Sequence, residues 1–147
     1  MKNKLAFLGA VSILAFFGCK KDLSEDITQY HWVLKSQTVT PAITLNGKTS
    51  TDYLSLQNPQ GCTRNNTLSF SENGVFYVSS NGALCDMLAN NDSQKWIKTD
   101  QKLLLKYGDG YEVEHVVEKD KMINTSTMVI GDKSYSLVTI RKAEKKK

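Results

Sequence analysis

Residues that commonly build catalytic and metal sites are scarce in this chain of 147 residues. It has two histidines, His31 and His115, and neither stands at metal-ligand spacing from any of the three cysteines. No serine lies in a Gly-x-Ser-x-Gly turn, and no Gly-x-x-x-x-Gly-Lys phosphate loop is present. Glu112 and Glu114 share a face of an expected strand opposite an apolar stripe, where carboxylates are usually solvated. We therefore predict a protein that is not an enzyme and that uses no metal and no cofactor.

The chain also lacks the basic stripe that a nucleic-acid-binding protein needs. Its formal net charge is +4, and Lys2 and Lys4 in the N-terminal segment supply half of it. Three further lysines stand together in the tail 143–147. The part between these two segments is close to neutral, so we predict no nucleic-acid partner.

Long apolar runs are absent except for one at the N-terminus. The run "LAFLGAVSILAFFG" (residues 5–18) follows a basic start and ends abruptly at "CKKD". A basic start, an apolar segment of roughly 7–15 residues and a small residue before the cut are typical of a secretory signal, and a membrane span needs about 20 apolar residues. We therefore predict a signal peptide over residues 1–18, with an uncleaved N-terminal anchor helix as the alternative.

The residues around Cys19 resemble the lipobox of bacterial lipoproteins, because the small Gly18 precedes a cysteine at the end of the apolar run. The resemblance implies cleavage before Cys19, acylation of its sulfur by fatty acids such as palmitate, and a tether over residues 19–28. Each buried methylene contributes about 0.8 kcal/mol, so several acyl chains would hold the protein firmly in the membrane. Lys20, rather than an Asp that favours inner-membrane retention, implies the outer membrane of the cell envelope. Both faces of that membrane, periplasmic and external, stay open at this point.

Cys62 and Cys85 are the two cysteines that the lipid would leave. In an oxidising exported compartment two cysteines indicate a disulfide. The bridge would close a loop of a little over 20 residues and contribute roughly 3 kcal/mol by the chain-entropy estimate. The alternative is a metal ligand or a nucleophilic thiol.

Apolar and polar residues alternate with a period of two over most of residues 29–142, and turn-forming pairs such as Asn73-Gly74 separate the segments. Helix is weakly indicated, by Ser50–Gln57 alone, inside one long connection, Thr38–Gly61, that follows a first strand over Tyr30–Gln37. Strands joined by short turns make an antiparallel meander, and closing the sheet removes its exposed edges. We predict an all-β fold, a single up-and-down antiparallel barrel of about eight strands over 29–142 with one long loop or short helix after the first strand, and then the basic tail 143–147.

Several segments of the chain together resemble the small lipocalin-like domain lipoproteins of Bacteroidetes. They are "WVL" near the start of the domain, "CTRNNTLSFSENGVF" in its middle, the strand around Trp96, and "YSLVTIRK" at its end. The resemblance implies a lipocalin-like barrel and, from the wider lipocalin group, a small hydrophobic ligand in a calyx. The chain departs from true lipocalins because no glycine stands two places before Trp32.

Alternation predicts which side chains face the barrel interior. The candidate lumen residues are Trp32, Leu34, Phe70, Trp96, Leu105, Tyr111, Val113 and His115. One hypothesis is an envelope-anchored barrel that binds a small apolar or amphipathic molecule among them. The alternative is a protein–protein interaction module with a filled core and no ligand, for example an envelope accessory subunit or a hydrolase inhibitor. An enclosed space of about 300 Å³ or more would favour the first hypothesis.

Overall fold

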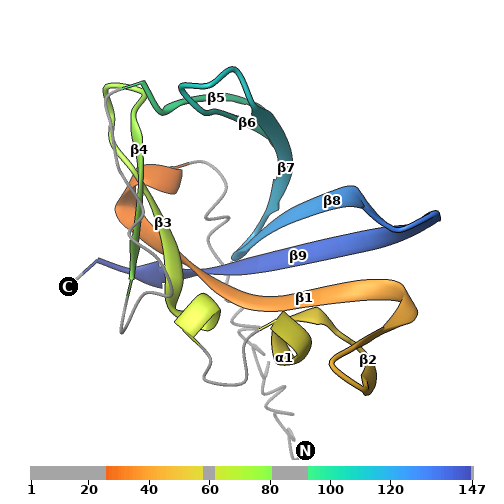
Figure 1. Ribbon diagram of the computed structural model, residues 1–147. Helices are drawn as coiled ribbons and strands as arrows, with labels where there is room; N and C mark the ends of the chain where they lie inside the picture. The colour runs from red at the N-terminus through yellow and green to blue at the C-terminus, as the bar shows by residue number, and fades with distance from the viewer. Residues whose placement is uncertain (1–25, 58–61, 81–92, 147) are drawn as a thin grey trace, which may run out of the picture.

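The computed structural model describes residues 26–57, 62–80 and 93–146 of the chain (Figure 1). The described part is mostly β-strand, with one short α-helix and two 3-10 turns. In chain order the elements are η1 (Ile27–Gln29), β1 (Tyr30–Leu45), β2 (Lys48–Asp52), α1 (Tyr53–Gln57), η2 (Cys62–Asn65), β3 (Asn66–Phe70), β4 (Phe76–Ser80), β5 (Lys95–Thr99), β6 (Lys102–Lys106), β7 (Glu112–Glu118), β8 (Lys121–Ile130) and β9 (Lys133–Lys145).

Eight of the nine strands form one antiparallel barrel. They follow the order β4-β3-β1-β9-β8-β7-β6-β5, and β2 pairs with β1 outside this path. The two ends of the path meet where the Phe76 N–H donates to the Gln94 carbonyl at 3.2 Å and the Trp96 N–H donates to the Gly74 carbonyl at 2.8 Å. Because only this short stretch joins β4 to β5, the barrel is nearly rather than fully closed. The predicted all-β, lipocalin-like up-and-down barrel is confirmed.

The first strand is twice as long as the sequence predicts. β1 has 16 residues and continues past Gln37 through Thr38–Leu45, where we expected the start of a long loop. Its register against β9 shifts between Leu34 and Ser36, which marks a β-bulge. A bulge inserts an extra residue and moves the buried face from one parity to the other. The alternation therefore breaks at this point, and the pattern fails to predict the second half of the strand.

The predicted helix over Ser50–Gln57 is also shorter than expected. Asn46 and Gly47 have φ angles of 52° and 77° and form the tight turn that returns the chain as β2. The segment up to Asp52 stays in this hairpin, and α1 begins only after it. The Ser55 N–H donates to the Asp52 carboxylate at 3.2 Å, which satisfies one of the free N–H groups of the first turn.

The long strands carry a second, smaller core outside the barrel. We call this part the extension: Thr38–Leu45 of β1, β2, α1, and the halves of β8 and β9 that meet at their hairpin. In Figure 1 it projects to the right of the barrel. Val39, Ile43 and Leu56 are its buried residues, and Met128 is among the partly buried side chains packed against them. α1 covers the apolar face of the extension and contributes Leu56 to its core. The extension therefore has a small apolar core of its own beside the barrel core.

The barrel core is larger and rich in aromatic side chains. Its buried members are Ile27, Trp32, Leu68, Phe70, Phe76, Val78, Leu103, Leu105, Val117 and Met122. Phe70 meets Trp96 edge-on with ring centroids 5.9 Å apart, and Phe76 meets Tyr107 in the same way at 5.1 Å. Burial of these rings is the main stabilising contribution that the fold offers.

The last strand runs into the segment that the sequence assigns to a basic tail. β9 continues to Lys145, three residues beyond the expected end of the barrel at Lys142. Lys146 then donates from Nζ to the Phe70 carbonyl at 3.2 Å and to the Thr28 carbonyl. Part of the segment 143–147 thus ties η1 to the barrel.

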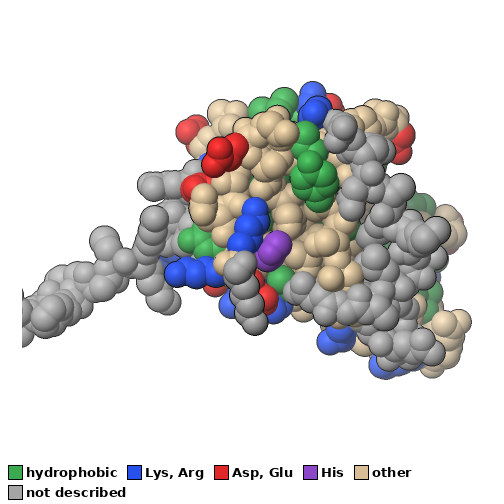
Figure 2. Space-filling view, turned by 90° about the vertical axis from the view of Figure 1, so that its left-hand side faces the viewer, with side chains coloured by type: hydrophobic (Ala, Val, Ile, Leu, Met, Phe, Trp, Pro, Cys, Tyr) green, Lys and Arg blue, Asp and Glu red, His purple; other side chains and the backbone are tan. Residues whose placement is uncertain are grey.

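The surface carries both signs of charge. On the face in Figure 2, basic and acidic side chains lie between polar ones and a few hydrophobic ones. Exposed ion pairs such as Lys35–Glu144, at 2.7 Å, contribute about 0–1 kcal/mol each. Within the described ranges, no helix is both long enough and apolar enough to cross a membrane.

Candidate functional site

One end of the barrel interior is packed solid. We call it the closed end; it is the end that η1 covers, where β1 begins and β9 ends. The Trp32 indole N–H donates to the Ile27 carbonyl at 3.1 Å, and the two side chains are 0% and 1% exposed. Phe70 and Leu105 beside them are also fully enclosed. Space for a ligand must therefore be sought toward the opposite end.

A charged side chain stands on the inner wall beyond this packed core. Arg141 of β9 pairs with Leu34 of β1 and with Met122 of β8, both of which are buried. Directly paired residues of an antiparallel sheet share a face, so Arg141 enters the barrel. Its guanidinium reaches across β1 to β3, where Nη2 donates to Asn66 Oδ1 at 2.8 Å and Nη1 to the Asn66 carbonyl at 3.1 Å. A third, longer contact joins Nη1 to the Trp32 carbonyl at 3.4 Å.

These acceptors are all uncharged. Among the described residues five ion pairs form on the surface, and Arg141 belongs to none of them. Burial lowers the pKa of the guanidinium to about 10, which still leaves it charged at neutral pH. A partly buried cation without a counter-charge is uncommon, because desolvation of a charge is costly unless it is paired.

Two titratable side chains lie within the electrostatic reach of Arg141. Burial, together with the nearby charge of Arg141, lowers the pKa of His115 to about 4, and the Val113 backbone opposes this shift. Burial raises the pKa of Tyr107, with Arg141 opposing that rise. At neutral pH, then, His115 is an uncharged imidazole and Tyr107 keeps its hydroxyl proton. Neither supplies the missing negative charge.

Among the described residues, three buried side-chain atoms make no hydrogen bond. His115 is 6% exposed, and its Nδ1 has no partner of acceptable geometry. Gln37 donates from Nε2 to Thr139 Oγ1 at 3.2 Å, yet its Oε1 is buried without a donor. Gln94 is 7% exposed, and its Oε1 is likewise unpaired. Buried polar atoms nearly always find partners, so three such atoms in one small barrel indicate groups that are satisfied by a bound molecule or by water.

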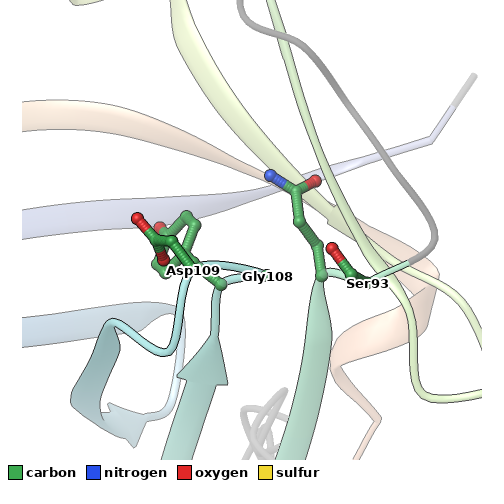
Figure 3. Close-up of a pocket in the computed structure, with 5 residues that line it drawn as sticks. Ser93, Gly108 and Asp109 are labelled. Atoms are coloured by element: carbon green, nitrogen blue, oxygen red, sulfur yellow. The ribbon is translucent and has the colours of Figure 1, made fainter.

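A cavity of about 360 Å³ opens beside Gln94, between the start of β5 and the turn that joins β6 to β7. Its walls are Ser93, Gln94, Tyr107, Gly108 and Asp109. Figure 3 shows Ser93 on one side of it and Gly108 with Asp109 on the other. Tyr107 links the cavity to the barrel core, because its ring packs edge-on against Phe76.

A second cavity, of about 420 Å³, lies outside the closed end. Its walls are Asp26, Gln29, Tyr30, Lys145 and Lys146. Most of these side chains are exposed, and Lys146 already donates to backbone carbonyls. We therefore place the candidate site at the cavity beside Tyr107.

The structure encloses most of the candidate lumen residues. Trp32, Leu34, Phe70, Leu105 and His115 are buried, and Trp96 and Val113 are partly buried. Tyr111 is 62% exposed, so its predicted place in the lumen is wrong. It lies in the turn before β7, where strand alternation does not apply, and its ring rests on Tyr107 with centroids 5.7 Å apart. A ligand-binding role for the enclosed residues stays a prediction.

The predicted cysteine chemistry lies outside the described residues. Cys19, Cys85 and the side chain of Cys62 all fall there, so both the acylation and the disulfide stay predictions. Within the described ranges, no group of three His, Cys, Asp or Glu side chains could hold a metal ion.

Sequence reasoning missed Arg141, Tyr107, Gln94 and Asn66. The sequence does hold a signal for Arg141. In the last strand it alternates onto the same face as Ala143, and it is one of two arginines in the chain. Gln94 lies directly before β5 and Tyr107 directly after β6, so the alternation within a strand does not predict where either side chain points.

Comparison with protein-family models, curated proteins and solved structures gives no match. The resemblance to lipocalin-like lipoproteins is thus a prediction about family, while the fold that it implied is observed.

Proposed function

We propose that this protein is a lipid-anchored envelope lipoprotein whose barrel binds a small amphipathic molecule at the end away from η1. The observation that carries the proposal is the cavity of about 360 Å³ beside Gln94 and Tyr107. Ligand sites occupy about 300–1,000 Å³ and combine apolar walls with a few fixed polar groups. Tyr107 supplies an aromatic ring, and Ser93, Gln94 and Asp109 supply polar side chains. The volume favours a small ligand over a long-chain lipid.

The binding proposal is tested with a neutral apolar dye such as Nile red. We expect saturable, one-to-one binding with a rise in dye fluorescence, and Ser93→Phe should weaken it about tenfold or more because the ring fills the cavity mouth. Ser79→Phe, at an exposed position of β4, is the matched control and should bind as the wild type does. Absence of saturable binding in the wild-type chain would contradict the proposal.

The lipid anchor rests on the N-terminal pattern that ends at Gly18-Cys19. Cys19→Ala should abolish incorporation of a palmitate analogue and release the protein from membranes, or leave its signal peptide uncleaved. Cys62→Ala is the control and should still be acylated. A Cys19→Ala protein that is processed and stays in the outer-membrane fraction after a high-salt wash would exclude the lipoprotein assignment.

The packed closed end favours a second candidate function. Trp32, Phe70 and Phe76 fill that half of the barrel, as expected of an interaction module with a solid core. In that case the cavity is a surface hollow, no dye binds, and the protein acts through contacts with another envelope protein. The dye titration separates the two functions.

A further inference from the structure

The second half of β8 forms an edge of the extension. β8 pairs with β7 only at its start, and that ladder ends where Ile123 lies opposite Val116. Just beyond, Asn124 donates from Nδ2 to the Glu114 carbonyl at 2.8 Å, which marks the fork between the two strands. Among the described residues, Asn124–Ile130 then pairs with β9 alone, and Figure 1 shows this half of β8 along the outer margin of the extension. We call Asn124–Ile130 the free edge, because one row of its backbone groups is open to another strand.

The free edge lacks the features that usually prevent sheets from pairing edge to edge. Native edge strands are commonly short, charged, bulged or interrupted by proline. Residues 122–131 contain no charged residue and no proline, and the register of β8 against β9 runs without a shift. β2, at the opposite edge of the extension, is five residues long and carries Lys48 and Asp52 at its two ends. Charge therefore protects one edge of this sheet and leaves the other open.

Side chains of the free edge are exposed on both faces of the sheet. Val129 is 65% exposed and Ile130 is 37% exposed, and Thr125 and Thr127 are exposed as well. Met128 lies between them and packs on the core of the extension, so its neighbours Thr127 and Val129 face away from that core. An added strand would therefore cover apolar side chains while it bonds to the backbone.

A second copy of this chain fits the free edge, because the edge is complementary to itself. Antiparallel pairing of two identical strands places a two-fold axis perpendicular to the sheet, so that directly opposite residues share a face. With the axis at Thr127, the middle of the free edge, Thr127 lies opposite its own copy and Thr125 lies opposite Val129. These pairs are all β-branched, which favours pairing across strands, and no charge meets a like charge.

We propose that this protein forms a symmetric dimer in which the free edges of two copies pair antiparallel and join the two extensions into one sheet. The inference goes beyond the proposed ligand binding, because the free edge shares no residue with the walls of the cavity beside Tyr107. The ladder engages only Asn124–Ile130 of each copy, fewer than the roughly 20–30 residues per side of a standard interface. The dimer is therefore weak and depends on protein concentration.

The register is tested by oxidising Thr127→Cys in the full chain, held in detergent micelles. Opposite residues of an antiparallel pair have Cα atoms about 4.5–5.5 Å apart, which suits a disulfide. We expect several-fold more disulfide-linked dimer than in the wild type, which reports any bridging by the native cysteines. Ser136→Cys is the matched control, because Ser136 is also exposed and lies opposite Thr127 on β9, one strand inward. Its two copies would lie about 14 Å apart, three strand spacings, and should not cross-link.

A second variant tests the interface without relying on a disulfide. Thr127→Lys introduces the residue that native edges use against pairing and places two like charges opposite each other in the dimer. We expect it to raise the dimer Kd, measured by sedimentation velocity over a concentration series, about tenfold or more. Ser136→Lys should change the Kd by about twofold at most, because its charges lie farther apart than the Debye length. Circular dichroism checks that both variants keep the fold.

The outcomes decide the dimer separately from ligand binding. A wild-type chain that stays monomeric over the whole series overturns the inference, as does cross-linking of Thr127→Cys that is no greater than that of Ser136→Cys. A dimer that Thr127→Lys leaves unchanged forms through another surface and also overturns it. Nile red should bind Thr127→Lys as it binds the wild type, so loss of the dimer leaves the proposed function intact.

Discussion

Trp32→Ala should lower the free energy of unfolding by about 3–5 kcal/mol, the usual effect of removing a large buried aromatic side chain. Trp32 is 0% exposed, and its indole N–H holds the Ile27 carbonyl at 3.1 Å. The substitution removes ring contacts in the core and leaves that carbonyl without its donor. For a barrel of this size such a loss is a large fraction of the total stability.

Urea unfolding followed by far-ultraviolet circular dichroism measures the effect without relying on tryptophan fluorescence. Tyr111→Ala is the control, because Tyr111 is 62% exposed and its loss should change the free energy by less than about 0.5 kcal/mol. Equal effects of the two substitutions would mean that Trp32 is not the centre of the core.

The second large effect is a loss of stability in mild acid that His115 causes. Its pKa falls from 6.5 in the unfolded chain to about 4 in the folded barrel, first because burial disfavours the imidazolium and then because Arg141 repels it. Between these two values the unfolded chain binds a proton that the folded chain excludes. The contribution to stability is therefore complete above pH 6.5, declines as the pH falls toward 4, and changes no further below that. The difference corresponds to about 3 kcal/mol.

The measurement is the free energy of unfolding of the wild type and of His115→Gln at intervals from pH 7.5 to about 3.5. Carboxylates titrate in both proteins, so the difference between the two curves isolates His115. We expect this difference in the free energy of unfolding to fall between pH 6.5 and about 4. In an Arg141→Gln background the pH at the midpoint of the fall should be higher, because the charge that repels the imidazolium is gone. Parallel curves for wild type and His115→Gln would show that the histidine is solvated rather than enclosed.

Much of the barrel follows from local sequence. Leu103 and Leu105 alternate with polar neighbours and are both 0% exposed, as a half-buried strand requires. The pair Asn73-Gly74 turns β3 into β4, and Gly74 has the positive φ of 81° that the turn needs. A period of two with frequent turns is typical of antiparallel sandwiches and barrels, and closing the meander into a barrel removes its exposed edges.

The extension was harder to predict, for a reason that lies at the bulge between Leu34 and Ser36. After the bulge, Gln37 and Val39 occupy the face that Leu34 occupied before it, although their parity is opposite. A residue pattern read along one strand cannot detect this change, because it depends on the register against β9. The sequence therefore places Thr38–Leu45 in a long connection, with at most a short extra strand around Ile43 and Leu45, while the structure continues β1 through the whole segment.

The sequence by itself determined the strand periodicity, the turns and the apolar residues of the barrel core, because those are set by neighbours along the chain. It also holds the N-terminal pattern that ends at Cys19. The tertiary structure alone decided which polar groups share the interior. Arg141, Tyr107 and Asn66 belong to three different strands or their ends, and the closure of the sheet, rather than any local signal, brings them together. Whether a long charged side chain on a strand enters the barrel depends on what faces it across the lumen, and that is fixed only when all eight strands have met.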